Sequence, residues 1–262
     1  MRLSRYAVLG FLFATLIAAR SAHAQGTWNG RESARTPVLV ELFTSEGCSS
    51  CPPADRLLQK LDQSQPIQNA EAVVLSEHVD YWDHDGWRDP FSSSFFTQRQ
   101  HQYGSRFGLD EVYTPQMVVN GKAQFVGNDS ARAIQAITDA ARVQTISVGI
   151  TNARFDGGVL KFRVDTGAPA SGKPAELYIV LAFDRATSHV SAGENSGREL
   201  THVSVARQFM SLGVIPPGPA FAKDVEFKLS KDWTPGNIRV IAFLQEPGQG
   251  AVLGIAVQRV TR

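Results

Sequence analysis

Cys48 and Cys51, the two cysteines of the chain, are the residues whose type and spacing most directly indicate chemistry. They form a Cys-x-x-Cys pair that follows an apolar run at residues 38–43 and precedes a helical pattern of apolar residues from Ala54 to Leu61. The start of a helix presents unpaired N–H groups and the positive end of the helix dipole, and both stabilise a thiolate. The pair is therefore predicted to be a redox-active dithiol/disulfide, in which Cys48 attacks and Cys51 resolves the mixed disulfide.

Two other roles for the cysteine pair stay open. A permanent disulfide over so short a loop removes little conformational entropy from the unfolded chain, so it would stabilise a chain of this length poorly. A metal site is the second alternative, because thiolates and imidazoles suit Cu(I) or Zn(II). The further candidate metal ligands are His78, Asp80 and His84, on an aromatic and acidic loop at residues 77–90. We expect this loop to cover the dithiol and shape a substrate groove, and the redox reaction itself requires no bound cofactor.

Residues 1–24 have the pattern of a secretory signal peptide. Arg2 and Arg5 form a basic n-region, residues 7–19 form an apolar h-region, and Ala22-His23-Ala24 matches a signal peptidase site. The apolar stretch is short for a membrane span, which needs about 20 residues, so an N-terminal anchor is the alternative to cleavage. We expect a periplasmic or secreted protein, in a compartment where disulfides persist.

The charge balance bears on the class of partner. The full chain carries a formal charge of +1, and removal of residues 1–24 takes away three arginines and no acidic residue, which leaves −2. Such a balance lacks the basic excess that attracts nucleic acid or anionic membranes. We expect protein thiols or disulfides as partners, no nucleic acid and no membrane span in the mature chain. The oligomeric state does not follow from the sequence.

The first half of the mature chain alternates strand and helix signals. Apolar runs predict strands, the Asn120-Gly121 pair predicts a two-residue hairpin, and amphipathic patterns predict helices. The expected order is βαβαββα, with Thr114-Pro115 directly before the third strand. The expected strands are 37–43, 72–76, 117–119 and 123–126, and the expected helices are about 51–62, 92–107 and 130–142.

The second half, residues 145–262, has a different character. Its apolar segments are rich in β-branched residues and are separated by Gly and Pro clusters, a pattern typical of an antiparallel sandwich. We therefore predict an α/β domain at residues 36–143 followed by an all-β sandwich of the immunoglobulin-like kind at 145–262. The expected strands are 145–152, 159–165, 175–183, 200–209, 221–229, 238–244 and 251–260.

Three features together resemble the thioredoxin superfamily: the dithiol at a strand-to-helix turn, Thr114-Pro115 before a strand, and the βαβαββα order. Several stretches resemble, more narrowly, an exported thioredoxin-like family of unknown function with a β-rich C-terminal domain. These stretches are Glu41–Cys48, His78–Trp82, Tyr113–Gln116 and Gly193–Arg198. The resemblance implies that Pro115 is cis and that its loop packs beside the dithiol and offers a docking edge to a substrate chain.

This chain departs from thioredoxin itself at several positions. Ser49-Ser50 stands between the cysteines in place of Gly-Pro, so a strongly reducing role does not follow from the resemblance. Gly47 stands where an aromatic residue usually precedes the first cysteine. Glu41 lies about one residue from the position of the superfamily's buried carboxylate, where it would relay a proton to Cys51; a solvated or paired glutamate is the alternative.

A second polar cluster lies in the β-rich half, at residues 194–198 and His202. We interpret this cluster as a plain loop between two strands. The alternative is that it contacts the first half of the chain and that Arg198 pairs with Asp83 or Asp85. A hydrolase is not indicated, because the chain lacks a Gly-x-Ser-x-Gly nucleophile elbow. The sequence thus predicts an exported thiol-disulfide oxidoreductase; the alternative is a copper or zinc carrier or a non-catalytic interaction protein on the same scaffold.

Overall fold

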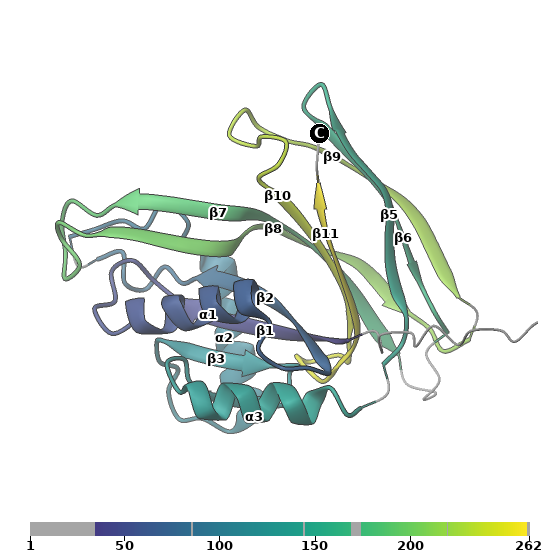
Figure 1. The fold of residues 1–262 in the computed structure, drawn as a ribbon, viewed down its shortest axis with the longest axis horizontal. Helices are drawn as coiled ribbons and strands as arrows, with labels where there is room; N and C mark the ends of the chain where they lie inside the picture. The colour runs from purple at the N-terminus through teal and green to yellow at the C-terminus, as the bar shows by residue number, and fades with distance from the viewer. Residues whose placement is uncertain (1–34, 85, 144, 169–173, 219, 261–262) are drawn as a thin grey trace, which may run out of the picture. The chain divides into compact units, whose positions relative to one another are not determined.

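The computed structural model describes residues 35–84, 86–143, 145–168, 174–218 and 220–260. The predicted signal peptide, residues 1–24, lies outside the described residues. Within the described part the protein is mixed α/β, with one large β-rich sheet and few helices (Figure 1). No helix of this part is long and apolar enough to span a membrane.

The first half of the chain has the expected element order. It contains four strands, β1 (Thr36–Thr44), β2 (Ala70–His78), β3 (Gln116–Val119) and β4 (Ala123–Val126), and three helices, α1 (Pro52–Ser64), α2 (Ser94–Phe107) and α3 (Ser130–Ala140). β1 pairs in parallel with β2 and antiparallel with β3, and β3 and β4 form a hairpin through the predicted turn. Both residues of that turn, Asn120 and Gly121, have positive φ angles of 53° and 65°, as a type I′ turn requires.

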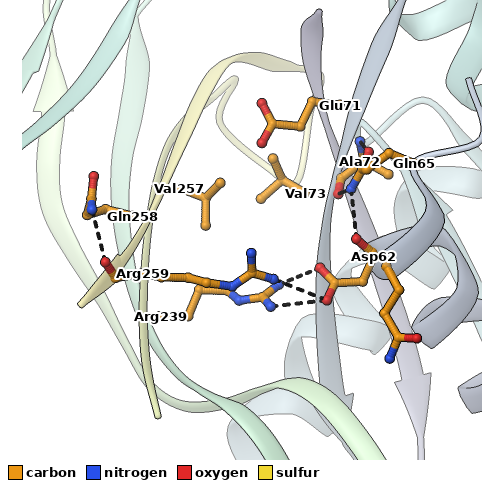
Figure 2. Close-up of a pocket in the computed structure, with 10 residues that line it drawn as sticks. Asp62, Gln65, Glu71, Ala72, Val73, Arg239, Val257, Gln258 and Arg259 are labelled. Atoms are coloured by element: carbon orange, nitrogen blue, oxygen red, sulfur yellow. Dashed lines mark hydrogen bonds and ion pairs between the residues drawn. The ribbon is translucent and has the colours of Figure 1, made fainter. Parts of the chain in front are cut away.

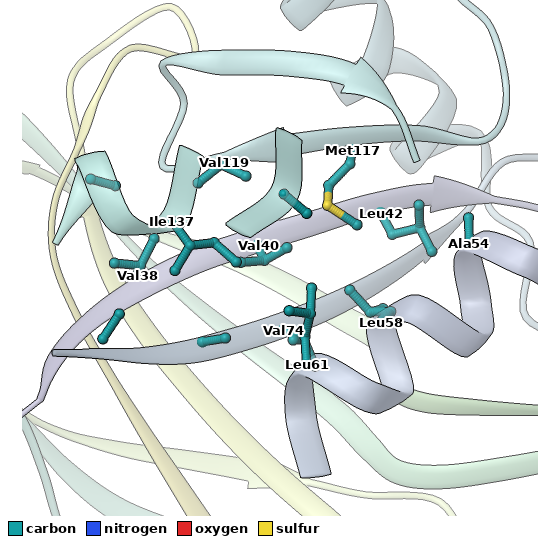
Figure 3. Packing of buried hydrophobic residues seen from close by; sticks show 14 of the residues in the cluster. Val38, Val40, Leu42, Ala54, Leu58, Leu61, Val74, Met117, Val119 and Ile137 are labelled. Carbon is teal, nitrogen blue, oxygen red and sulfur yellow. The ribbon is translucent and has the colours of Figure 1, made fainter. Parts of the chain in front are cut away.

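Alternation of side chains along β1 divides the first half into two apolar layers. Val38, Val40 and Leu42 face one side of the sheet, where they pack against α1 and α3 (Figure 3). Leu39 and Phe43 face the other side, which α2 covers. Helices on both faces explain why β1 and β2 are buried along most of their length.

The described residues of the second half form seven strands. They are β5 (Val148–Asp156), β6 (Val159–Thr166), β7 (Ala175–His189), β8 (Glu199–Ile215), β9 (Phe221–Lys228), β10 (Ile238–Gln245) and β11 (Val252–Val260). β5, β6 and β9 form a three-stranded sheet whose apolar face packs against β7, β10 and β11. β7 and β8 are longer than the expected strands: the end of β7 pairs with the start of β8, and the end of β8 pairs with the start of β7.

The two halves share one sheet. Its eight strands run in the order β11-β10-β7-β8-β2-β1-β3-β4, and the halves join where Ser76 of β2 pairs in parallel with Val205 of β8. The described residues form one compact unit. The predicted division into domains at 36–143 and 145–262 and the immunoglobulin-like class both stay predictions.

Candidate functional site

Cys48 and Cys51 are joined by a disulfide at the junction of β1 and α1, with their Cα atoms 5.4 Å apart. The helix starts directly after the pair, and Pro52 and Pro53 in its first turn lack the N–H groups that would find no partner there. The side chains of both cysteines are fully buried, whereas the two serines between them are exposed. The sulfurs are therefore covered by neighbouring elements.

The segment before β3 is one of these neighbours. The peptide bond between Thr114 and Pro115 is cis, and Pro115 is buried. Ser50 lies between this segment and the disulfide: its Oγ is 3.3 Å from Cys48 Sγ and donates to the Thr114 carbonyl at 3.5 Å. The structure thus brings Cys48, Cys51 and Pro115 together, while the docking role of Pro115 stays a prediction.

Trp82 supplies an aromatic ring beside the position that precedes the first cysteine. Its indole N–H donates to Thr114 Oγ1 at 2.7 Å, and its own backbone lies against Gly47. A Cβ atom at position 47 would come within 3.0 Å of both Trp82 Cβ and the Trp82 carbonyl oxygen. This close approach favours glycine at position 47, and it places the loop at 77–90 against the segment that leads into the dithiol.

The tip of the β7–β8 hairpin also covers the pair. Asn195 is buried, and its amide donates to the carbonyls of Glu46 at 2.8 Å and of Cys48 at 3.0 Å. Glu194 accepts from the backbone N–H of Ser49 at 3.1 Å. The interpretation of residues 194–198 as a plain loop was wrong, because this loop binds the backbone of the cysteine segment.

Arg198 does not reach toward the acidic loop. Its guanidinium donates to Asn195 Oδ1 at 2.9 Å and orients the amide that binds the cysteine segment. Asp83 accepts instead from the hydroxyl of Ser92 at 2.8 Å. The pairing of Arg198 with Asp83 was therefore wrong, and Asp85 lies outside the described residues.

A buried charged cluster lies next to the disulfide, made by Glu46, Asp55 and His202. His202 on β8 has Nε2 at 3.3 Å from Glu46 Oε1 and Nδ1 at 3.7 Å from Asp55 Oδ1. Burial lowers the pKa of His202, but Asp55 and then Glu46 outweigh this effect and raise the pKa to about 10. His202 is therefore an imidazolium at neutral pH.

A second buried pair adjoins this cluster. His78 Nδ1 lies 2.7 Å from Asp89 Oδ2, and the same oxygen accepts from the backbone N–H of Glu46 at 2.8 Å. Burial raises the pKa of Asp89, but His78 and the hydrogen bonds outweigh it and lower the pKa to about 2. The rings of His78 and His202 meet edge to face, with their centroids 4.6 Å apart.

The candidate metal ligands on the loop at 77–90 have other partners or positions. His78 is fully buried and bound to Asp89, and Asp80 Oδ1 accepts from Thr97 Oγ1 at 2.5 Å, whereas His84 is exposed. Within the described ranges, no three His, Cys, Asp or Glu side chains come together in a way that could hold a metal ion.

Glu41 points away from the cysteines. Side chains alternate along β1, so Glu41 lies on the α2 face, while Leu42 lies on the face that packs against α1. Arg99 and Tyr103 of α2 donate to its carboxylate at 2.6 and 2.7 Å. Of the two interpretations of Glu41, the paired side chain is confirmed and the proton relay to Cys51 was wrong, because the one-residue offset places this carboxylate on the opposite face of the sheet.

A cavity of about 450 Å³ lies at the other end of α1, between β2, β10 and β11 (Figure 2). Its polar wall is an internally paired set of charges: Arg239 donates to Asp62 at 2.7 Å and to Asp184 at 2.5 Å, and Arg259 donates to the same two carboxylates. These charges are neutralised by one another. The paired arginines and aspartates of this wall therefore leave no free charge of their own to recognise a ligand.

Glu46 and Asp55 were missed as site residues by the reasoning from sequence, and His202 was named only as part of the second polar cluster, without a link to the dithiol. Asp55 carried a signal, because it stands one helical turn after Cys51, and Glu46 stands two residues before Cys48. His202 belongs to a distant strand, and nothing local indicates that it reaches the dithiol. Only the pairing of β8 with β2 brings it there.

The comparisons with known proteins agree with this architecture. The family described as "Protein of unknown function (DUF1223)" matches residues 39–245. A crystal structure of a protein from Agrobacterium tumefaciens is 26% identical, with a TM-score of 0.66 over 87% of this chain and 95% of its own. HBP35 of Porphyromonas gingivalis is 16% identical, with a TM-score of 0.66 over 86% of this chain and 76% of its own, and shares the fold. No curated protein matches.

Proposed function

The chain belongs to the DUF1223 family of proteins of unknown function, and we propose that it is an exported thiol-disulfide oxidoreductase acting through Cys48 and Cys51. The observation that carries the proposal is a disulfide at the start of α1, beside a cis-proline and a buried charged cluster. A helix N-terminus and a nearby cation both stabilise a thiolate, which is the reactive form of cysteine.

We further infer that residues 36–143 are a thioredoxin-like domain. Four features support this: the βαβαββα order, the strand order β2-β1-β3-β4, the position of the cysteines, and Pro115 next to them. The β-rich half would be an immunoglobulin-like sandwich that holds or selects the partner. Its support is the packing of the β5-β6-β9 sheet against β7, β10 and β11.

In the proposed reaction, a partner dithiol exchanges with the disulfide. A partner thiolate attacks Cys48 Sγ, the bond between the two sulfurs breaks, and Cys51 leaves as a thiolate that takes up a proton. The second partner thiolate then attacks the mixed disulfide and releases Cys48. The partner loses two electrons and two protons and forms its own disulfide. A second thiol-disulfide couple, from a protein or a small thiol, restores the starting state, and the reverse sequence reduces a partner.

Burial of both sulfurs sets a condition on this reaction. A partner thiolate reaches Cys48 only when covering groups move, and these groups include the exposed serines at 49 and 50 and the loop that carries Asn195. These groups bind one another through a small number of hydrogen bonds, each worth about 0.5–1.5 kcal/mol. Docking of a partner would supply the free energy for that movement.

A non-catalytic interaction protein is the second candidate function, and the same burial favours it. In that case the disulfide would fix the turn between β1 and α1, and neither sulfur would exchange with a partner. The two candidates differ in one measurable property, the reversibility of the disulfide in a thiol buffer.

The test is equilibration of the full mature chain with glutathione buffers, followed by assays of Cys48→Ser and Cys51→Ser. We expect reversible reduction of the disulfide, loss of thiol exchange in Cys48→Ser, and a trapped mixed disulfide with a partner in Cys51→Ser, because the resolving sulfur is then missing.

The non-catalytic candidate predicts a different pattern. A disulfide that stays oxidised at every glutathione ratio, together with no trapped species in Cys51→Ser, would overturn the oxidoreductase proposal. Ser196→Ala is the matched control, because this hydroxyl lies in the covering loop and donates only within it, to the Ser191 carbonyl at 3.2 Å.

A further inference from the structure

His202 lies between two carboxylates that flank the cysteine pair in the sequence. Its Nε2 is 3.3 Å from Glu46, two residues before Cys48, and its Nδ1 is 3.7 Å from Asp55, one helical turn after Cys51. Glu46, Asp55 and His202 are 0%, 6% and 1% exposed. The imidazole therefore bridges the segment that leads into the pair and the helix that leaves it.

Other groups donate hydrogen bonds to the two carboxylates. Thr44 Oγ1 donates to Asp55 Oδ1 at 3.0 Å, and the Trp87 indole donates to Glu46 Oε2 at 2.8 Å. The backbone N–H of Asp55 donates to the Cys51 carbonyl at 3.1 Å. These hydrogen bonds connect the two partners of His202 to β1, to the loop at 77–90 and to the backbone of Cys51.

The charged groups around His202 are of both signs. Glu46 and Asp55 contribute two negative charges, and the imidazolium contributes one positive charge. His78 lies edge to face with His202, but its partner is Asp89, and Phe91, the other ring against His202, is uncharged. Removal of a positive or a negative charge from this cluster therefore changes the electrostatic potential at the sulfurs of Cys48 and Cys51.

We propose that His202 is a positioning residue for the dithiol, which holds Glu46 and Asp55 in place and sets with them the electrostatic potential at Cys48 and Cys51. It acts through the two carboxylates and does not touch the substrate. The inference rests on the proposed function, and it gives the β-rich half a role in the redox balance of the cysteine pair.

The sign of the effect follows from the reaction. Reduction breaks the bond between the two sulfurs, takes up two electrons, and leaves each sulfur with either a proton or a negative charge. A nearby cation favours the thiolate, whereas a nearby carboxylate favours the thiol. A stabilised thiolate favours the reduced pair and raises the reduction potential. Loss of the His202 charge should therefore lower the potential, and loss of the Glu46 charge should raise it.

The test compares His202→Gln with Glu46→Gln in the full mature chain. The pKa of the Cys48 thiol is measured by thiolate absorbance after reduction with a phosphine, and the equilibrium with glutathione is measured separately. We expect the equilibrium constant to move roughly tenfold in opposite directions in the two variants, with the thiol pKa higher in His202→Gln and lower in Glu46→Gln. Arg163→Gln, which loses an exposed charge on β6, should change neither quantity.

The inference is supported if the equilibrium constant and the thiol pKa shift in opposite directions in His202→Gln and Glu46→Gln. The shifts in His202→Lys should be smaller than in His202→Gln, because lysine keeps a positive charge. Shifts of the same sign would indicate a general loosening of the packing and would overturn it, and so would the absence of any shift. If His202→Gln does not fold, Glu46→Gln and Asp55→Asn test the same sign, and failure of both to raise the potential overturns the inference. Failure of the proposed function is a separate result. The pKa of the Cys48 thiol in phosphine-reduced protein tests the role of His202, and it can be measured even when the wild-type disulfide exchanges with no thiol.

Discussion

A charged imidazole at His202 is stable in the interior because two carboxylates face it. Burial alone would lower its pKa and remove the charge, yet Asp55 and Glu46 raise the pKa to about 10. The folded-state pKa thus lies above the value of about 6.5 for the unfolded chain. The group contributes its full stabilisation below pH 6.5, and this stabilisation is lost as the pH rises toward 10.

This linkage gives a prediction for the oxidised protein. Between pH 7 and pH 9 the free energy of unfolding should fall by about 1.4 kcal/mol per pH unit on account of His202, because one proton is bound in the folded state and not in the unfolded state. Urea denaturation at several pH values measures the slope. In His202→Gln the free energy of unfolding should lose this contribution to its pH dependence. An unchanged pH dependence in that variant would contradict the assignment of a positive charge to His202.

At the scale of elements, the site is formed by four segments that converge on the start of α1. β1 carries the cysteine segment, the loop at 77–90 brings Trp82, the segment before β3 brings Pro115, and the β7–β8 hairpin brings Asn195. The hairpin also lies along α1, where the Gln59 side chain donates to the Thr201 carbonyl. Its tip is a covering element that comes from the second half of the chain.

We predict that Asn195→Ala makes the disulfide more accessible. The substitution removes two hydrogen bonds to the cysteine segment, together worth about 1–3 kcal/mol, so opening of the loop should become roughly tenfold or more easier. The rate of reduction by dithiothreitol in native buffer measures this, with Ser196→Ala as the control that should keep the wild-type rate. Equal rates in Asn195→Ala and wild type would mean that this loop does not limit access.

At the scale of the whole molecule, hydrogen bonds and buried ion pairs cross between the two halves. Arg239 of β10 is 3% exposed and binds Asp62 of α1, a buried pair whose disruption typically costs about 3–5 kcal/mol. Arg99 of α2 binds Glu41 and also donates to Gln245 of β10. Near the β3–β4 turn, a Cβ at Gly121 would lie 2.1 Å from the Gly250 carbonyl oxygen, so glycine is required there as well.

These connections predict that both halves unfold together. Two variants would each keep one tryptophan and carry Phe at the others: Trp82 reports on the site, and Trp233, buried against Phe183 with ring centroids 4.6 Å apart, reports on the β-rich core. The midpoints of denaturant unfolding should coincide in the two variants. Separate midpoints would instead agree with two independent domains at 36–143 and 145–262.

The strands, the helices and the cysteine pair were predictable because their signals are local. Periods of two and 3.6 in the apolar residues, the Asn120-Gly121 turn and the spacing of Cys48 and Cys51 are short-range patterns that the chain carries without its tertiary structure. The same patterns indicated the position of Pro115 before β3. They did not indicate the face on which Glu41 points, because a one-residue offset along a strand reverses the direction of the side chain.

By itself, the sequence determined a Cys-x-x-Cys pair at the start of a helix. Only the tertiary structure decided its surroundings: the disulfide is buried, Trp82 and Asn195 cover it, and Glu46, Asp55 and His202 form a charged cluster beside it. The physical reason is the distance along the chain between these groups. Electrostatic interactions and burial depend on separation in space, and His202 comes within 3.3 Å of Glu46 only because β8 joins the sheet next to β2.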